Sequence, residues 1–96
     1  MYQDLYFINC EYGMFLDEAG GCLILNCWYN NCQVGVFCGG GSAYNFNNCN
    51  FAWGTTYGIE LGLSPTTNNE TGVTVYGCNF TSTVGILTTR DNHTLV

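Results

Sequence analysis

The chain has 96 residues, a net charge of −6 and a single strongly basic residue, Arg90. Nucleic-acid binding draws on several cationic contacts to phosphate, so this composition excludes nucleic acid as a partner and disfavours an anionic membrane surface. No apolar run is long enough to span a bilayer, and the first residues lack the basic start and apolar core of a secretory signal.

The first feature along the chain is an eight-residue pattern that returns three times. It reads apolar, any, apolar, any, Asn or Gly, Cys, any, aromatic, and it covers residues 5–12, 22–29, 44–51 and 73–80. A second element follows each copy, namely Gly, apolar, any and a mostly apolar residue, at 13–16, 35–38, 58–61 and 85–88. Alternation with period two predicts short strands, and the density of Gly, Asn and Thr disfavours helix.

The residue before each repeated cysteine is of a type that tolerates left-handed backbone angles. One such residue bends a strand sharply, so that the cysteine and the aromatic residue two positions after the cysteine both point inward. The predicted corner residues are Asn9, Asn26, Asn48 and Gly77. The cysteines predicted to stack in one inward column are Cys10, Cys27, Cys49 and Cys78.

Seven cysteines in so short a chain suggest either disulfides or buried thiols. Stacked strands bring Cα atoms close enough for a disulfide but leave the Cβ atoms slightly too far apart. We therefore expect the column to consist of free thiols that act as small apolar side chains. Cys22 and Cys38 are also expected to face inward, whereas Cys32 is expected in a corner, as the best candidate for an intermolecular bond.

Repeats of this kind predict an all-β fold, a parallel β-solenoid of about four coils that is open at both ends. The repeat units are 5–21, 22–43, 44–72 and 73–96, in a single domain, with longer connections in the corners at 39–42 and 62–72. The first unit is irregular, because Gly13 follows Tyr12 directly without the spacer seen later. Either that coil is narrowed or its register is shifted.

With these motifs the chain resembles the right-handed parallel β-helix superfamily, the pectate-lyase-like coils also found in bacteriophage tailspikes and many extracellular proteins. The resemblance implies an extracellular, virion or cell-surface location. It leaves the activity open, because that fold hosts lyases, hydrolases, epimerases, adhesins and inert fibres. Catalysis in its enzymes uses clustered Asp residues on an outward sheet face. The matching outward positions here are Phe15, Phe37, Glu60 and Leu87, which do not form a catalytic row, so we expect no enzyme.

Other candidate chemistry is weaker still. Asp17-Glu18 reads as a solvated turn rather than a calcium site, and Gly39-Gly40-Gly41 lacks the Lys and helix of a phosphate loop. His93 lies in a polar corner away from the inward cysteines, and no CxxC spacing suggests zinc. We therefore expect no metal and no cofactor. Three sequons offer N-glycosylation sites at Asn69, Asn79 and Asn92.

The ends and the outer faces suggest association. The chain begins and ends with coil-like segments and shows no polar cap. Outward apolar side chains are expected in rows, with Phe15, Phe37 and Leu87 in one row, Tyr6 and Leu23 in a second and Trp28 in a neighbouring row.

Two hypotheses follow from these features. The first is a structural, self-associating solenoid in an extracellular fibre, whose partner is another copy stacked end to end or side by side. The alternative is a polysaccharide-binding or polysaccharide-cleaving fragment, in which Glu60 and Asp17 converge with the 62–72 loop around a groove and carbohydrate is the partner.

Overall fold

The computed structural model describes residues 1–16, 21–39, 43–62, 71–88 and 93–95. All the regular elements in these ranges are short β-strands. None of the described residues forms a helix able to cross a membrane. The strands are β1 (Tyr2–Gln3), β2 (Tyr6–Ile8), β3 (Tyr12–Leu16), β4 (Cys22–Leu25), β5 (Trp28–Asn30), β6 (Val34–Cys38), β7 (Tyr44–Asn47), β8 (Asn50–Phe51), β9 (Tyr57–Leu61), β10 (Thr71–Tyr76), β11 (Asn79–Phe80), β12 (Val84–Thr88) and β13 (His93–Leu95).

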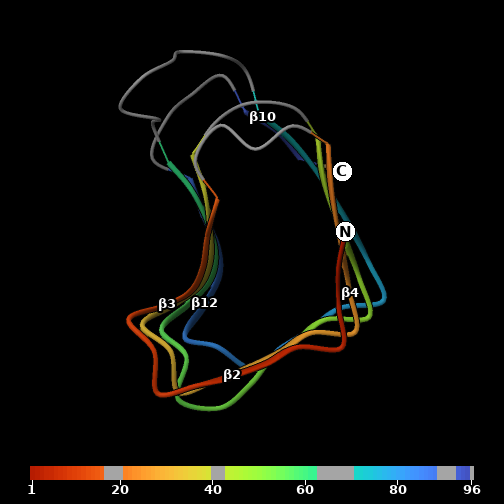
Figure 1. The fold of residues 1–96 in the computed structure, drawn as a ribbon. Helices are drawn as coiled ribbons and strands as arrows, with labels where there is room; N and C mark the ends of the chain where they lie inside the picture. Colours follow the sequence, from red (N-terminus) through yellow and green to blue (C-terminus); the bar gives the residue numbers. More distant parts are fainter. Residues whose placement is uncertain (17–20, 40–42, 63–70, 89–92, 96) are drawn as a thin grey trace.

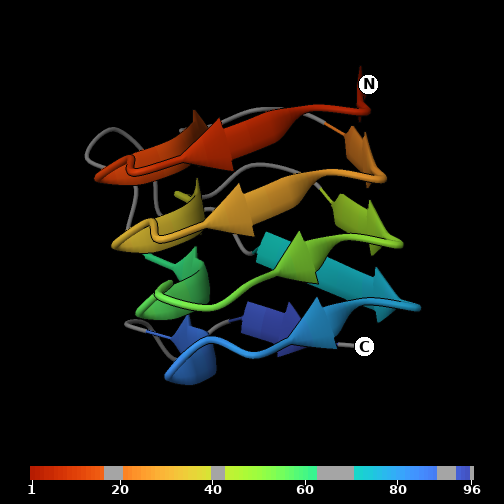
Figure 2. The same cartoon turned by 90° about the horizontal axis from the view of Figure 1, so that it is seen from below.

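The strands form three parallel sheets, in the orders β1-β4-β7-β10-β13, β2-β5-β8-β11 and β3-β6-β9-β12. Each strand pairs with the strand three places further along the chain, so consecutive strands lie in different sheets and three strands complete one turn. Viewed along the axis, the turns superimpose (Figure 1), and from the side they form stacked layers with the two termini at opposite ends (Figure 2). The predicted fold, an all-β parallel β-helix of about four coils, is confirmed.

Coil 1 contains β1–β3, coil 2 β4–β6, coil 3 β7–β9 and coil 4 β10–β12, and β13 begins a further layer on the first sheet. The alternation of inward and outward side chains explains why these short segments become strands. In β4 and β7 the burial alternates residue by residue, which places every second side chain in the core.

Left-handed residues make the bends, as the repeats suggested, but coils 1 to 3 each have two such corners. The corner between the first two strands of a coil uses Asn26, Asn48 and Gly77, with φ of 52°, 54° and 65°. The next corner uses Asn9 and Asn31, with φ of 57° and 55°, and Gly54, with φ of 87°. Only Gly and, less readily, Asn or Asp adopt these angles at low cost.

The first coil departs from the register that its local motif suggests. Tyr6 lies beside Trp28 and Phe7 beside Tyr29, which places Asp4, with φ of 59°, at the corner position of Asn26. Leu5 therefore stands where Cys27 stands one coil later. The prediction that Cys10 shares the inward column of Cys27 is wrong. The prediction that Asn9 shares the corner of Asn26 is wrong for the same reason.

The register of coil 1 was predicted wrongly because the two corners of coils 1 to 3 have similar chemistry. Asn9-Cys10 occupies the second corner of its coil and matches Asn31-Cys32, as the hydrogen bond from the Gln33 backbone N–H to the carbonyl of Cys10 shows (2.9 Å). Both corners place a left-handed residue before a small inward residue, so the dipeptide alone does not distinguish them. The shift also leaves Tyr12, expected inward, exposed at the start of β3.

A column of aromatic rings fills the core between the second and third sheets. Phe7, Tyr29, Phe51 and Phe80 follow one another at centroid distances of 5.3, 4.8 and 4.8 Å, each pair with its planes within 5°. Tyr29 and Phe51 are fully buried. Burial of each such ring contributes about 1.5–3 kcal/mol, so this column is a principal source of the fold's stability.

The repeated glycines explain how the rings fit. A Cβ on Gly13 would stand 2.7 Å from the ring of Tyr29, and one on Gly58 would stand 2.9 Å from the ring of Phe80. Real Cβ atoms do not approach that closely, so the third strand of a coil needs glycine where the ring of the next coil lies against it.

Candidate functional site

The cysteines are all free thiols, and five of the seven are buried. Cys27, Cys49 and Cys78 occupy equivalent positions in three successive coils. The Cys49 thiol lies 3.5 Å from the carbonyl oxygen of Ile24, and the Cys78 thiol lies 3.5 Å from that of Phe46. Each thiol thus has a weak acceptor in the preceding coil, which suits a structural role. Cys22 and Cys38 are buried in the core, where the sequence placed them.

Burial disfavours ionisation of most of these thiols. It raises the pKa of Cys22, Cys32 and Cys38 above the ordinary range of a cysteine. Cys78 differs, because its side-chain hydrogen bond with Cys49 lowers its pKa to about 6. The same hydrogen bond, together with burial, raises the pKa of Cys49. Cys78 is therefore the thiol most ready to form a thiolate at neutral pH.

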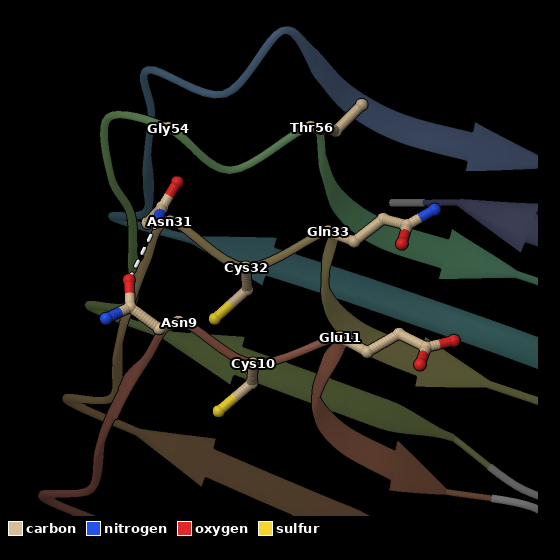
Figure 3. Close-up of a pocket in the computed structure, with 8 residues that line it drawn as sticks. All are labelled: Asn9, Cys10, Glu11, Asn31, Cys32, Gln33, Gly54 and Thr56. Atoms are coloured by element: carbon tan, nitrogen blue, oxygen red, sulfur yellow. Dashed lines mark hydrogen bonds between the residues drawn. The ribbon is translucent and has the colours of Figure 1, made fainter.

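A shallow polar groove of about 470 Å³ lies at the second corner of the coils (Figure 3). The side-chain amide of Asn31 donates a hydrogen bond of 2.7 Å to the Asn9 side-chain oxygen, which joins coils 1 and 2. The thiols of Cys10 and Cys32 point in the same direction, one coil apart. The residues that line the groove are Asn9, Cys10, Glu11, Asn31, Cys32, Gln33, Gly54 and Thr56.

Cys32 was expected to be open to an intermolecular disulfide, and this prediction is wrong. Its side chain is fully buried, and its sulfur lies 3.8 Å from the carbonyl oxygen of Phe7. Its backbone N–H donates to the hydroxyl of Thr55 at 3.3 Å, and that hydroxyl donates to the carbonyl of Tyr29 at 3.3 Å. Cys32 is therefore inward, because the corner turns the residue after Asn31 toward the core.

The groove offers little reactive chemistry. Glu11 is the one carboxylate in its lining, and the described residues contain no group of three His, Cys, Asp or Glu side chains able to hold a metal ion. The other titratable groups of the lining are the thiols of Cys10 and Cys32, and burial raises the pKa of Cys32. Asp17, Glu18, Asn69 and Asn92 lie outside the described residues, as does the side chain of His93.

The outward rows differ in part from the expected arrangement. Phe15, Phe37, Glu60 and Leu87 do align across the third sheet. Phe15 is 56% exposed, whereas Phe37 is buried, because the ring of Phe15 stacks on it at 4.5 Å and Gly62 lies against it. This row therefore exposes one large aromatic side chain.

A second outward row was assigned incorrectly. Tyr6 is aligned with Trp28, not with Leu23, which lies on the first sheet beside Asn45. The rings of Tyr6 and Trp28 stack at 6.0 Å and are 58% and 44% exposed. The amide of Asn30 donates to the hydroxyl of Tyr6 at 3.3 Å. Further along this sheet, the sequon residue Asn79 is exposed on β11.

The two ends of the stack form the most extensive candidate site. Several apolar side chains pack against the core yet stay only partly buried, and all of them lie in the outer coils. They are Phe7 and Cys10 in coil 1, and Val75, Cys78, Phe80 and Ile86 in coil 4. Among the described strands, β1, β2 and β3 of coil 1 each pair on one side only, as do β11 and β12 of coil 4 and β13, which pairs with β10. Both ends therefore present unpaired strand edges over an apolar core.

Comparisons with protein-family profiles, with curated proteins and with solved structures found no significant match. The function of the chain must therefore be argued from its own geometry.

Proposed function

We propose that the protein is structural: a self-associating β-solenoid that forms a subunit or segment of an extracellular fibre and performs no catalysis. The observation that supports this most is the pair of open core ends, where Phe7 and Phe80 are only partly buried. A solenoid coil gains stability mainly from its neighbours, so an uncovered coil favours the addition of another.

The arrangement of the strand edges adds to this support. All three sheets are parallel and begin in the same coil, and at the other end β11 and β12 stop at coil 4 while β13 already continues the first sheet, so a further coil would extend the stack in the direction that β13 begins. Parallel stacking of this kind is heterologous and generates an open filament rather than a closed ring. The resemblance of the repeats to the parallel β-helix superfamily agrees with an extracellular, virion or cell-surface setting, where such coils form shafts and spikes.

Sedimentation velocity and negative-stain microscopy of the purified 96-residue chain over a range of concentrations test this proposal. We expect a concentration-dependent series of oligomers and filaments that are one solenoid wide. Dispersed monomers at the highest concentration would count against the proposal.

A second candidate function is carbohydrate binding. It is favoured by the exposed, stacked rings of Tyr6 and Trp28, with the amide of Asn30 beside them. Exposed aromatic rings next to neutral hydrogen-bonding groups suit sugars, whose faces are apolar and whose rims carry hydroxyls. Incubation with neutral and acidic polysaccharides separates the candidates, because binding predicts retardation that Trp28→Ala abolishes, and cleavage predicts new unsaturated ends. A fibre subunit shows neither effect.

A further inference from the structure

We infer that copies of this chain join head to tail, with coil 1 of one copy seated on coil 4 of another and the Phe7 ring entering a slot at Gly85. This inference rests on the proposed self-association and specifies its partner, orientation and contact. The slot and the ring that fits it lie at opposite ends of one molecule.

The slot is the space beside Gly85 that corresponds to the space filled by an aromatic ring beside the equivalent glycines of coils 1 to 3. The ring of the next coil approaches the Cβ positions of Gly13 and Gly35 to 2.7 Å and that of Gly58 to 2.9 Å. At Gly85, the fourth member of the series, the nearest atom is 3.5 Å away and belongs to Phe80 of the same coil. Gly85 thus has the geometry of the other three without the ring that makes glycine necessary there.

Phe7 supplies the matching ring. It is the first member of the aromatic column, and its other face has no ring against it among the described residues. The column continues at 4.8–5.3 Å per coil with planes within 5°. An incoming Phe7 stacked on Phe80 at this interval would also reach Gly85, as Phe80 reaches Gly58.

The backbone of the second sheet, whose last strand is β11, offers a hydrogen-bond ladder for the same placement, whereas on the first sheet β13 already pairs with residues 71–73 of β10. Within the chain, the N–H of Asn50 donates to the carbonyl of Cys27 at 2.9 Å, and that of Asn79 donates to the carbonyl of Cys49 at 3.0 Å. The next donor in this series is the N–H of Tyr6 in the incoming copy, and its acceptor is the carbonyl of Cys78. By the same rule the N–H of Ile8 would donate to the carbonyl of Phe80, as Thr81 donates to Phe51 at 2.9 Å.

Charge selects head to tail over head to head. Coil 1 carries the exposed carboxylates of Asp4 and Glu11, whereas the described residues of coil 4, 71–88, include no Asp or Glu. Two coil 1 faces in contact would bring the carboxylates of both copies to one interface, where like charges repel. With coil 1 on coil 4, the register instead places Asp4 next to Gly77 and Glu11 next to Thr83.

The test is the critical concentration for assembly of the full chain and its variants, measured by sedimentation. Gly85→Ala places a methyl group that the single copy accommodates, since its nearest neighbour is at 3.5 Å, but that an incoming ring would contact too closely. We expect this variant to raise the critical concentration roughly tenfold or more, as overpacking of a tight site does. Tyr76→Ala, at an outward side chain that is 75% exposed in the same coil, is the matched control and should leave assembly unchanged.

A double-mutant cycle that combines Gly85→Ala with Phe7→Ala tests whether the two residues contact each other across the interface. Phe7 and Gly85 lie three coils apart within one copy, so their effects on assembly are additive unless they touch across the interface. We expect the critical concentration of the double variant to be lower than the two single effects added together would give, since removing the ring makes room for the methyl group.

The outcomes separate the two proposals. If the unaltered chain does not assemble, the proposed function fails. If it assembles but Gly85→Ala has an unchanged critical concentration, or the cycle is additive, the head-to-tail contact is overturned and self-association stands. Should Gly85→Ala unfold when dilute, hydrogen exchange of the unaltered chain decides: assembly must protect the amides of Tyr6 and Ile8, and unprotected amides overturn the contact.

Discussion

Gly35 lies directly against the ring of Phe51, so that a Cβ built on Gly35 would stand 2.7 Å from Cδ1 of that ring and 2.5 Å from the carbonyl oxygen of Gly58. The glycine belongs to β6 of coil 2 and the ring to β8 of coil 3. The relationship shows that the spacing between coils is set by side-chain packing as well as by the backbone ladder.

We therefore predict that Gly35→Ala destabilises the fold by about 1–3 kcal/mol, because the ring and a backbone carbonyl must both move to admit the methyl group. The measurement is the free energy of unfolding from urea titration of dilute protein. Gly85→Ala, the matched control, should change it by no more than about 0.5 kcal/mol, since its Cβ meets only ordinary contacts. Equal effects of the two substitutions would contradict the packing argument.

The corner at Asn26 gives a second prediction. This residue has a φ of 52° and an exposed side chain, so its value to the fold lies in its backbone angle. Asn26→Ala should cost about 1–2 kcal/mol of stability, the penalty of a left-handed conformation for a residue with an unsupported Cβ. Asn26→Gly should be nearly neutral in the same urea titration. The idea would be abandoned if the glycine variant lost as much stability as the alanine variant.

The buried thiols make stability depend on alkaline pH. The pKa values of Cys22, Cys32, Cys38 and Cys49 are raised in the native state, so above about pH 8.5 the unfolded chain releases protons that the native chain keeps. These thiols contribute fully to the stability of the fold below that pH, and their contribution is lost as the pH rises further. Once the unfolded thiols are ionised, each group lowers the free energy of unfolding by about 1.4 kcal/mol per pH unit until the native thiol ionises as well.

Cys78 acts in the opposite sense at lower pH. Its pKa is lowered to about 6 in the native state, so its contribution to stability grows from pH 6 to the ordinary cysteine pKa and is lost as the pH falls through 6. Urea titrations from pH 5 to 10, with a phosphine reductant present, should show stability rising and then falling steeply above about pH 8.5. A flat profile between pH 8 and 10 is incompatible with these buried thiols. Cys78→Ser should remove the rise and keep the fall.

Thiol labelling gives a fourth prediction. Among the seven cysteines only Cys10 and Cys78 are partly exposed. A thiol reagent added to the native chain at pH 7 should therefore modify these two cysteines first. Cys78 should react fastest, because its lowered pKa supplies more thiolate. Mass spectrometry of the digested protein identifies the labelled sites, with urea-unfolded protein as the control in which all seven react. Labelling of Cys32 at the rate of Cys10 would contradict its burial.

Much of the architecture could be predicted from the sequence, because the features that set it are local and repeated. The glycines at 13, 35, 58 and 85 align as their shared element indicates, and Tyr29, Phe51 and Phe80 enter the core two residues after a cysteine. The packing of a ring requires a glycine, and a left-handed bend requires an Asn or Gly. Both constraints are local in the sequence, so they can be recognised without a structure.

The first coil could not be placed from its dipeptide alone. Asn9-Cys10 satisfies the same backbone and volume requirements as Asn26-Cys27, yet it belongs to the next corner. The distance to the following glycine carried the missing information, since Cys27 precedes Gly35 by 8 residues, whereas Cys10 precedes Gly13 by only 3. Leu5 restores the interval of 8 to Gly13, although it lacks the cysteine that marks the column.

The candidate sites were harder to predict, because exposure depends on neighbouring coils. Phe37 occupies an outward position but is covered by Phe15 and Gly62, and the pairing of Tyr6 with Trp28 followed from the shifted register. An alternating pattern specifies which way a side chain points, and it does not specify what lies above it.

The regular interval between coils also has a consequence for how the chain folds. Asp4, Asn26 and Asn48 are separated by 22 residues each, so every strand pair in this region closes a segment of similar length. The entropic cost of loop closure rises only with the logarithm of length, so no one pair of turns is strongly favoured as the starting point. Folding can therefore nucleate between any two adjacent turns and then propagate in both directions, with the slow step being the first closure rather than the later ones.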